Sequence, residues 1–159
     1  MHYGVEVVIL RLPAQHLADT VGHRYQLRRI AGTSGITRVT KFDPSRLSCQ
    51  IAGEVKGFDV APYMSPKEAR RMDTFIHYGV ATGLQAWRDC GLQVTPENAE
   101  RIGINFGSGI GGLPLIEATH KEYSERGPRR ISPFFVPASI INMISGHVSI
   151  FFGFQGPNL

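Results

Sequence analysis

The chain has 159 residues, enough for one domain with a buried core, and its 42% hydrophobic and 19% charged residues are typical of a globular rather than a disordered protein. Its net charge of +4 mildly favours acidic partners, although a slightly basic globular protein without such partners has the same balance. No apolar run approaches the ~20 residues that cross a bilayer, and two cysteines without a disulfide or C-x-x-C pattern indicate a reduced, cytoplasmic setting.

The first third of the chain has weak patterns. Residues 1–30 contain one short apolar run, Val5 to Leu12, that could form a strand. Residues 33–43 are predicted as loop and turn. Residues 48–55 alternate loosely and are predicted to form one strand of an antiparallel pair.

A clear helix is predicted to begin at Ser65. Ser65 is a favourable N-cap, Pro66 occupies the first helical position and Glu68 completes a capping box. Gly91 is expected to end this helix. Small and apolar residues at spacings of three and four predict one packing face: Met72, Phe75, Ile76, Gly79, Val80, Gly83, Ala86, Trp87 and Cys90.

The second half of the chain alternates between predicted strands and helices. A short helical turn is predicted to begin at Thr95, followed by a strand over residues 101–106 and a helix over residues 113–125. After a proline-rich loop, residues 138–152 have a strong helical apolar pattern. Helices alternating with strands predict an α/β protein.

The run Gly107-Ser108-Gly109-Ile110-Gly111-Gly112 satisfies G-x-G-x-x-G between a predicted strand and a predicted helix. Such a turn can bring a phosphate close to backbone amides at a helix N-terminus. However, no acidic residue ends a second strand about 20 residues later, as dinucleotide binding requires. A tight glycine turn for close packing between strand and helix is therefore the favoured interpretation.

Two basic clusters are candidates for binding an anionic partner. Lys67, Arg70 and Arg71 lie near the start of the predicted helix, where Lys67 and Arg71 would share a face. Arg129 and Arg130 form the second cluster. Cations at a helix N-terminus oppose the macrodipole, so either they serve a docking surface or they form an ordinary solvated face.

The remaining polar residues give no pattern of a metal site or a catalytic thiol. The six histidines have no ligand spacing, so we expect no metal. His147 lies in an apolar helix and is predicted to be a packed histidine. Cys90 is expected to be structural because it falls on a packing face, and Cys49 has no sign of activation.

The segment Phe134-Phe135-Val136 lies between Pro133 and Pro137 and forms an apolar loop. Exposed contiguous apolar surface is unfavourable in water. We therefore expect this loop to be buried against a partner, a ligand or the rest of a larger fold.

These segments occur in the same order in elongating β-ketoacyl-[acyl-carrier-protein] synthases of the bacterial type II kind, which the chain resembles over about residues 31–159. The likeness is to synthase II-like members, with polyketide ketosynthases as the nearest relatives. The blocks that carry it are Ala31 to Thr37, Phe42-Asp43, Met64 to Asp73, Arg101 to Gly103, Gly107 to Gly112, and Arg130 to Pro157.

The resemblance implies a thiolase-like, layered α/β/α fold and a homodimeric enzyme of fatty-acid synthesis. Such an enzyme moves an acyl group from acyl-carrier protein to a cysteine, then condenses it with decarboxylated malonyl-carrier protein. It also implies that Lys67, Arg70, Arg71, Arg129 and Arg130 dock the carrier protein. Ile110 would line the acyl pocket, and Phe135 would be offered across the dimer interface. No cofactor, metal or nucleic acid is implied.

The chain also departs from the family pattern. Residues 1–30 lack the family's opening strand and glycine turn, so we expect a divergent segment there, followed by an incomplete half-domain over residues 31–159. Neither Cys49 nor Cys90 matches the nucleophile, and the catalytic histidines are not matched either. The chain alone is therefore expected not to catalyse condensation. The alternatives are a non-catalytic module for carrier-protein binding or dimerisation, and part of a polyketide ketosynthase.

Overall fold

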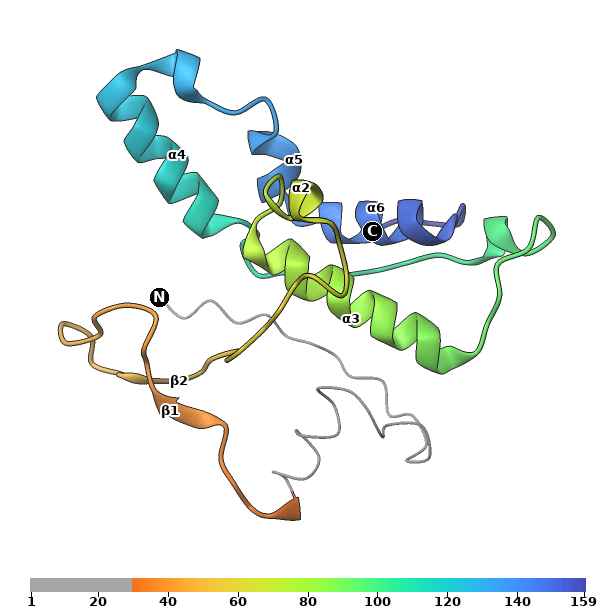
Figure 1. Ribbon diagram of the computed structural model, residues 1–159, viewed down its shortest axis with the longest axis horizontal. Helices are drawn as coiled ribbons and strands as arrows, with labels where there is room; N and C mark the ends of the chain where they lie inside the picture. The colour runs from red at the N-terminus through yellow and green to blue at the C-terminus, as the bar shows by residue number, and fades with distance from the viewer. Residues whose placement is uncertain (1–29) are drawn as a thin grey trace. The chain divides into compact units, whose positions relative to one another are not determined.

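The computed structural model describes residues 30–159, which fall into two compact units, residues 30–59 and residues 60–159 (Figure 1). The predictions for residues 1–29, including the divergent N-terminal segment, lie outside the described residues. No helix within residues 30–159 is both long enough and apolar enough to cross a membrane.

The unit of residues 30–59 is built around a short antiparallel hairpin. Strand β1 (Ile36–Arg38) pairs with β2 (Ile51–Gly53). The carboxylate of Glu54 accepts hydrogen bonds from the backbone N–H groups of Thr40, at 2.9 Å, and Lys41, at 3.0 Å. The predicted antiparallel strand is confirmed. The expectation of only loop over residues 33–43 is wrong, because three residues are too few to give an alternating pattern.

The unit of residues 60–159 is mainly helical. Its longer helices are α3 (Thr74–Cys90), α4 (Leu113–Arg126) and α6 (Met143–Phe152). Its shorter turns are α2 (Pro66–Ala69), α5 (Phe135–Ser139), η1 (Ala99–Arg101) and η2 (Pro128–Arg130).

The two predicted long helices are each divided in the structure. The helix predicted from Ser65 to Gly91 is α2 followed by α3, because the Asp73 side chain accepts from the Phe75 N–H and starts a new helix. The helix predicted over residues 138–152 is the end of α5 followed by α6, because Ile140 is extended. The capping box at Ser65 is confirmed, and so is Gly91, which has φ of 68° at the end of α3.

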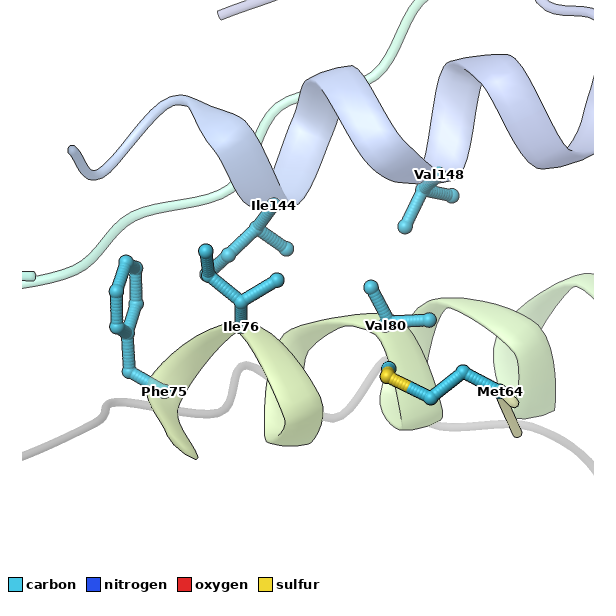
Figure 2. Packing of buried hydrophobic residues seen from close by; sticks show 6 residues of the cluster. All are labelled: Met64, Phe75, Ile76, Val80, Ile144 and Val148. Carbon is cyan, nitrogen blue, oxygen red and sulfur yellow. The ribbon is translucent and has the colours of Figure 1, made fainter. Parts of the chain in front are cut away.

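The core lies where α3 packs against α6. Figure 2 shows Ile76 and Val80 of α3 facing Ile144 and Val148 of α6, all of them buried. Gly79 permits this approach, because a Cβ atom there would lie 2.3 Å from Ile144 Cγ2. The predicted packing face is thus confirmed over its first three turns.

The last turn of α3 differs from the prediction. Trp87 packs on Phe152 and Phe154, with ring centroids 5.3 and 4.8 Å away. Ala86 and Cys90 are exposed. Cys90 is therefore not the packed structural residue that the periodicity predicts, because it lies at the last helical position, beyond these aromatic contacts.

The predicted strand over residues 101–106 is present only as a short parallel pairing with residues 156–159. Ile104 donates its N–H to the Pro157 carbonyl at 2.8 Å, and Leu159 donates to the Ile104 carbonyl at 3.0 Å. A Cβ atom on Gly156 would lie 2.7 Å from the Ile102 carbonyl carbon, so this close pairing requires glycine there. The layered α/β/α arrangement is therefore seen only in part, as helices beside one parallel bridge.

Candidate functional site

The first basic cluster lies on and directly after α2. The Ser65 hydroxyl accepts from the Glu68 N–H, and the Glu68 carboxylate accepts from the Ser65 N–H at 3.0 Å, so this turn is rigidly capped. Lys67 and Arg70 are exposed. The prediction that Lys67 and Arg71 share a helix face is wrong, because α2 ends at Ala69.

The second basic cluster lies on η2, which follows α4. Gly127 ends α4 by donating its N–H to the Tyr123 carbonyl at 2.8 Å, and Arg129 and Arg130 follow in the exposed η2 turn. Within residues 30–159 the structure has one ion pair, Arg126 with Glu122 at 3.3 Å. Neither basic cluster takes part in that pair, so both are exposed and positively charged.

Arg71 of the first cluster contacts the apolar segment that follows the second cluster. Its guanidinium carbon lies 4.4 Å from the centroid of the Phe134 ring, within the range of a cation–π contact. Phe134 is the residue directly before α5 and lies four positions after Arg130. The structure thus places the end of the first basic cluster beside the N-terminal end of α5, and Figure 1 shows α2 close to α5, whereas η2 follows the C-terminal end of α4.

The apolar segment Phe134–Val136 is not fully covered by the described part of the chain. Phe134 is 40% exposed and Val136 is 57% exposed, whereas Phe135 is half-buried. The segment is also not a simple loop, because α5 begins at Phe135, and Pro137 is tolerated within the first turn of a helix. The expected burial therefore requires something other than residues 30–159.

The glycine turn of residues 107–112 packs on the C-terminal end of α5. Gly111 has φ of 85°, and a Cβ atom there would lie 2.5 Å from the Ser139 carbonyl oxygen. The Gly112 N–H donates to that same oxygen at 2.9 Å. Ile110 is 51% exposed in this turn. The structure therefore places Ile110 near one end of α5 and Phe135 at the other end.

The N-terminus of α4 is already occupied by groups of the chain. The Leu115 N–H donates to the Asp73 carboxylate at 3.0 Å, and the Leu113 N–H donates to the Gly111 carbonyl at 2.9 Å. A phosphate would meet a buried carboxylate there instead of open donors. The geometry favours the packing turn over the dinucleotide site.

Asp73 is the residue of this region that the sequence did not reveal. Its side chain caps α3 through Phe75 and also binds the first turn of α4 through Leu115. Its own N–H donates to the Ala138 carbonyl of α5 at 3.3 Å. The sequence did contain one signal for it: aspartate favours the N-cap of a helix, and Asp73 stood in the interior of a predicted helix.

His147 and Glu68 form the one electrostatically perturbed pair near the basic surface. Hydrogen bonds from the Ser65 hydroxyl and N–H, with His147 nearby, hold the pKa of the Glu68 carboxyl below its usual value. Burial lowers the pKa of His147, and the charge of Glu68 partly opposes that shift. The predicted packed histidine is confirmed by its half-buried position. Residues 30–159 contain no group of three or more His, Cys, Asp or Glu side chains that could hold a metal ion.

Comparison with known proteins identifies the family of this chain. Residues 25–159 match the model of the "Beta-ketoacyl synthase, N-terminal domain". The chain is 56% identical over 130 residues to 3-oxoacyl-[acyl-carrier-protein] synthase 2 of Vibrio cholerae, and 46% identical over 130 residues to the protein of that name from Coxiella burnetii. Each alignment covers 82% of this chain and 31% of the relative. The chain thus spans about a third of the length of these curated relatives.

A solved structure is similar as well. It is a type II PKS acyl-carrier protein in complex with its ketosynthase bound to the hexaketide. The TM-score is 0.59 and the sequence identity 28%, over 64% of this chain and 29% of that chain.

Proposed function

Because this chain belongs to the β-ketoacyl synthase family, we propose that it forms the N-terminal part of an enzyme that elongates fatty acids. The reaction is the decarboxylative condensation of an acyl thioester with malonyl-acyl-carrier protein. Residues 31–159 would supply an incomplete half-domain of a thiolase-like fold, preceded by a divergent segment over residues 1–30. The names of the relatives, which include acyl-carrier protein, support this proposal.

The proposed role of this part of the enzyme is to bind the acyl-carrier protein. The observation that carries the proposal is the pair of exposed basic clusters, the first of which contacts Phe134 through Arg71. A surface of unneutralised cations attracts an acidic partner and accelerates its association. Lys67, Arg70, Arg129 and Arg130 would contact acidic groups of the carrier protein, with Arg71 in the same surface.

The condensation itself would be performed by residues outside the 159. In the proposed reaction a thiolate attacks the acyl thioester carbonyl, and the carrier's thiol leaves. Malonyl thioester then loses CO₂, and its carbanion attacks the new acyl thioester and releases the enzyme thiolate. Cys49 and Cys90 are both exposed, on the hairpin unit and at the end of α3 respectively, and neither is proposed as nucleophile. We expect no condensation product from the isolated chain.

The exposed apolar residues are proposed to complete a pocket and an interface. Ile110 would line the acyl pocket, and Phe135 would be offered to a second copy of the enzyme. The partial exposure of Phe134, Val136 and Ile110 supports this, because such surface is normally covered. The complete enzyme would therefore be a homodimer.

Titration calorimetry with holo acyl-carrier protein tests the docking proposal. The double variants Lys67→Glu/Arg70→Glu and Arg129→Glu/Arg130→Glu should each weaken binding at least about 10-fold and flatten its salt dependence. Arg88→Glu is the matched control, since Arg88 is an exposed cation near the other end of α3. Equal affinities of all three variants and the parent chain would refute the docking surface.

Two alternatives are distinguished by the substrates and partners that they require. The similarity to the ketosynthase complex favours a polyketide pathway as the second candidate, in which a polyketide carrier protein would bind more tightly than a fatty-acid carrier protein. A non-catalytic module for carrier-protein binding or dimerisation would bind the carrier protein or a complete synthase and have no role in turnover.

A further inference from the structure

Arg71 differs from the other cations of the basic surface in what its side chain contacts. Its guanidinium lies over the Phe134 ring at 4.4 Å. Lys67 and Arg70 are exposed, as Arg71 is, but within residues 30–159 neither of them makes a cation–π contact. A guanidinium engaged with an aromatic face has a fixed orientation, and it is less available to follow a partner's carboxylates.

The contact of Arg71 is one of two that join the α2–α3 connection to α5. Two residues later, the Asp73 N–H donates to the Ala138 carbonyl at 3.3 Å. Phe134 and Ala138 are themselves one helical turn apart, and the Ala138 N–H donates to the Phe134 carbonyl at 2.9 Å. The inner contact is buried, with Asp73 7% and Ala138 3% exposed, whereas the outer contact lies at the surface.

Two contacts one helical turn apart fix the orientation of α5 relative to the α2–α3 connection as well as its position. The buried contact holds the C-terminal half of α5, and the outer contact holds its N-terminal end beside Arg71. The outer contact holds Phe134, whose N–H donates to the Ser132 hydroxyl at 3.1 Å, two residues after η2. From this geometry we infer that Arg71 is a positioning residue: by stacking on Phe134 it holds the two basic clusters at the spacing that a carrier protein recognises.

This inference rests on the proposed binding of acyl-carrier protein, and it makes a prediction opposite to that of a simple docking cation. Lysine keeps the charge of Arg71 but lacks its planar face. If Arg71 only supplied charge, Arg71→Lys would bind like the parent chain. If Arg71 acts through Phe134, then Arg71→Lys and Phe134→Leu should each weaken binding roughly 2- to 5-fold, the value of an exposed cation–π contact.

The experiment is a double-variant cycle measured by titration of the full 159-residue chain with holo acyl-carrier protein. We expect Arg71→Lys/Phe134→Leu to bind no more weakly than either single variant, because both remove the same contact. In the control cycle, Arg70→Gln and Phe134→Leu should have multiplicative effects. Arg70→Gln should also reduce the salt dependence of binding, whereas Arg71→Lys should leave it unchanged.

A spectroscopic signal of the contact itself accompanies the titrations. The side-chain N–H proton of Arg71 should be shifted upfield by the Phe134 ring, and Phe134→Leu should abolish that shift while the fold, measured by circular dichroism, is kept. If Phe134→Leu disturbs folding, the titration of Arg71→Lys alone still tests the inference.

Failure of this inference can be distinguished from failure of the proposed function. Parent-like binding by Arg71→Lys, or multiplicative effects in the Arg71/Phe134 cycle, would overturn the positioning role and leave the docking surface intact. Absence of carrier binding by the parent chain would overturn the proposed function together with this inference.

Discussion

The carboxylate of Asp73 accepts a hydrogen bond from the backbone N–H of Leu115, at 3.0 Å and 42 positions later in the chain. Its other oxygen accepts from the Phe75 N–H at 3.3 Å, so one buried side chain starts both α3 and α4. Asp73 therefore holds the glycine turn that precedes α4 close to the α2–α3 connection that carries Arg70 and Arg71.

Asp73→Ala should therefore lower the free energy of unfolding by on the order of 2 kcal/mol, from the lost cap and an unsatisfied buried N–H. Urea unfolding followed by the fluorescence of Trp87 measures this. Glu117→Ala, at an exposed position of α4, is the control and should change stability by less than about 0.5 kcal/mol. Equal stability of the two variants would contradict the role given to Asp73.

Gly79→Ala should destabilise the packing of α3 against α6. The added methyl would lie 2.3 Å from Ile144 Cγ2 in a buried contact, and overpacking costs about 1–3 kcal/mol. Gly146→Ala is the matched control within α6, since the nearest atoms to its Cβ are those of Met143 at 3.8 Å. The control should be neutral or up to about 1 kcal/mol more stable, since alanine favours the helix. If Gly79→Ala left the free energy of unfolding unchanged while Gly146→Ala lowered it, this packing would be disproved.

The sequence predicted the residues of the core better than the bounds of the helices. The spacing of Phe75, Ile76 and Val80 predicted the face that packs, because periodicity reflects burial. The break between α2 and α3 was missed, because it depends on Asp73 meeting Leu115 far along the chain. The two basic clusters were predicted, but the contact of Arg71 with Phe134 is a tertiary contact that no local pattern encodes.

The stability of the chain should fall as the pH is lowered through the histidine range. Burial lowers the pKa of His147 below its ordinary value of 6.5, so the unfolded chain binds the proton first. The free energy of unfolding should be constant above roughly pH 7.5, decrease through 6.5 and level off below the folded pKa. His147→Gln should remove this part of the pH dependence, measured as the difference in unfolding free energy between the two chains.

A second loss of stability should occur at lower pH, and Glu68 should contribute to it together with Glu54 and Glu97, whose pKa values are also lowered by hydrogen bonds. The pKa of Glu68 lies below the ordinary 4.5, so its stabilising effect is present above that value and is lost as the pH falls through the folded pKa. Glu68→Gln should therefore reduce the acid limb and deepen the histidine limb, because the charge that partly opposes the lowered pKa of His147 is lost. A histidine limb that persists in His147→Gln would rule out the assignment.

The apolar residues at α5 should cause self-association. Val136 and Ile140 are four positions apart, and they are 57% and 40% exposed. Sedimentation equilibrium of the parent chain should give an average mass that rises with concentration, and Val136→Asp should reduce that rise. Leu92→Asp, at a 60% exposed position after α3, is the control and should associate like the parent chain. A monomeric parent chain would contradict this prediction.

The most direct test of the central claim, that the two basic clusters form one surface for a carrier protein, is to map binding residue by residue. Backbone amide signals of the chain are recorded by NMR while holo acyl-carrier protein is added. The account predicts that the perturbed signals gather in residues 65–71 and 128–135, with little change around Arg88. Perturbations that spare both segments, or that affect only one of them, would contradict it.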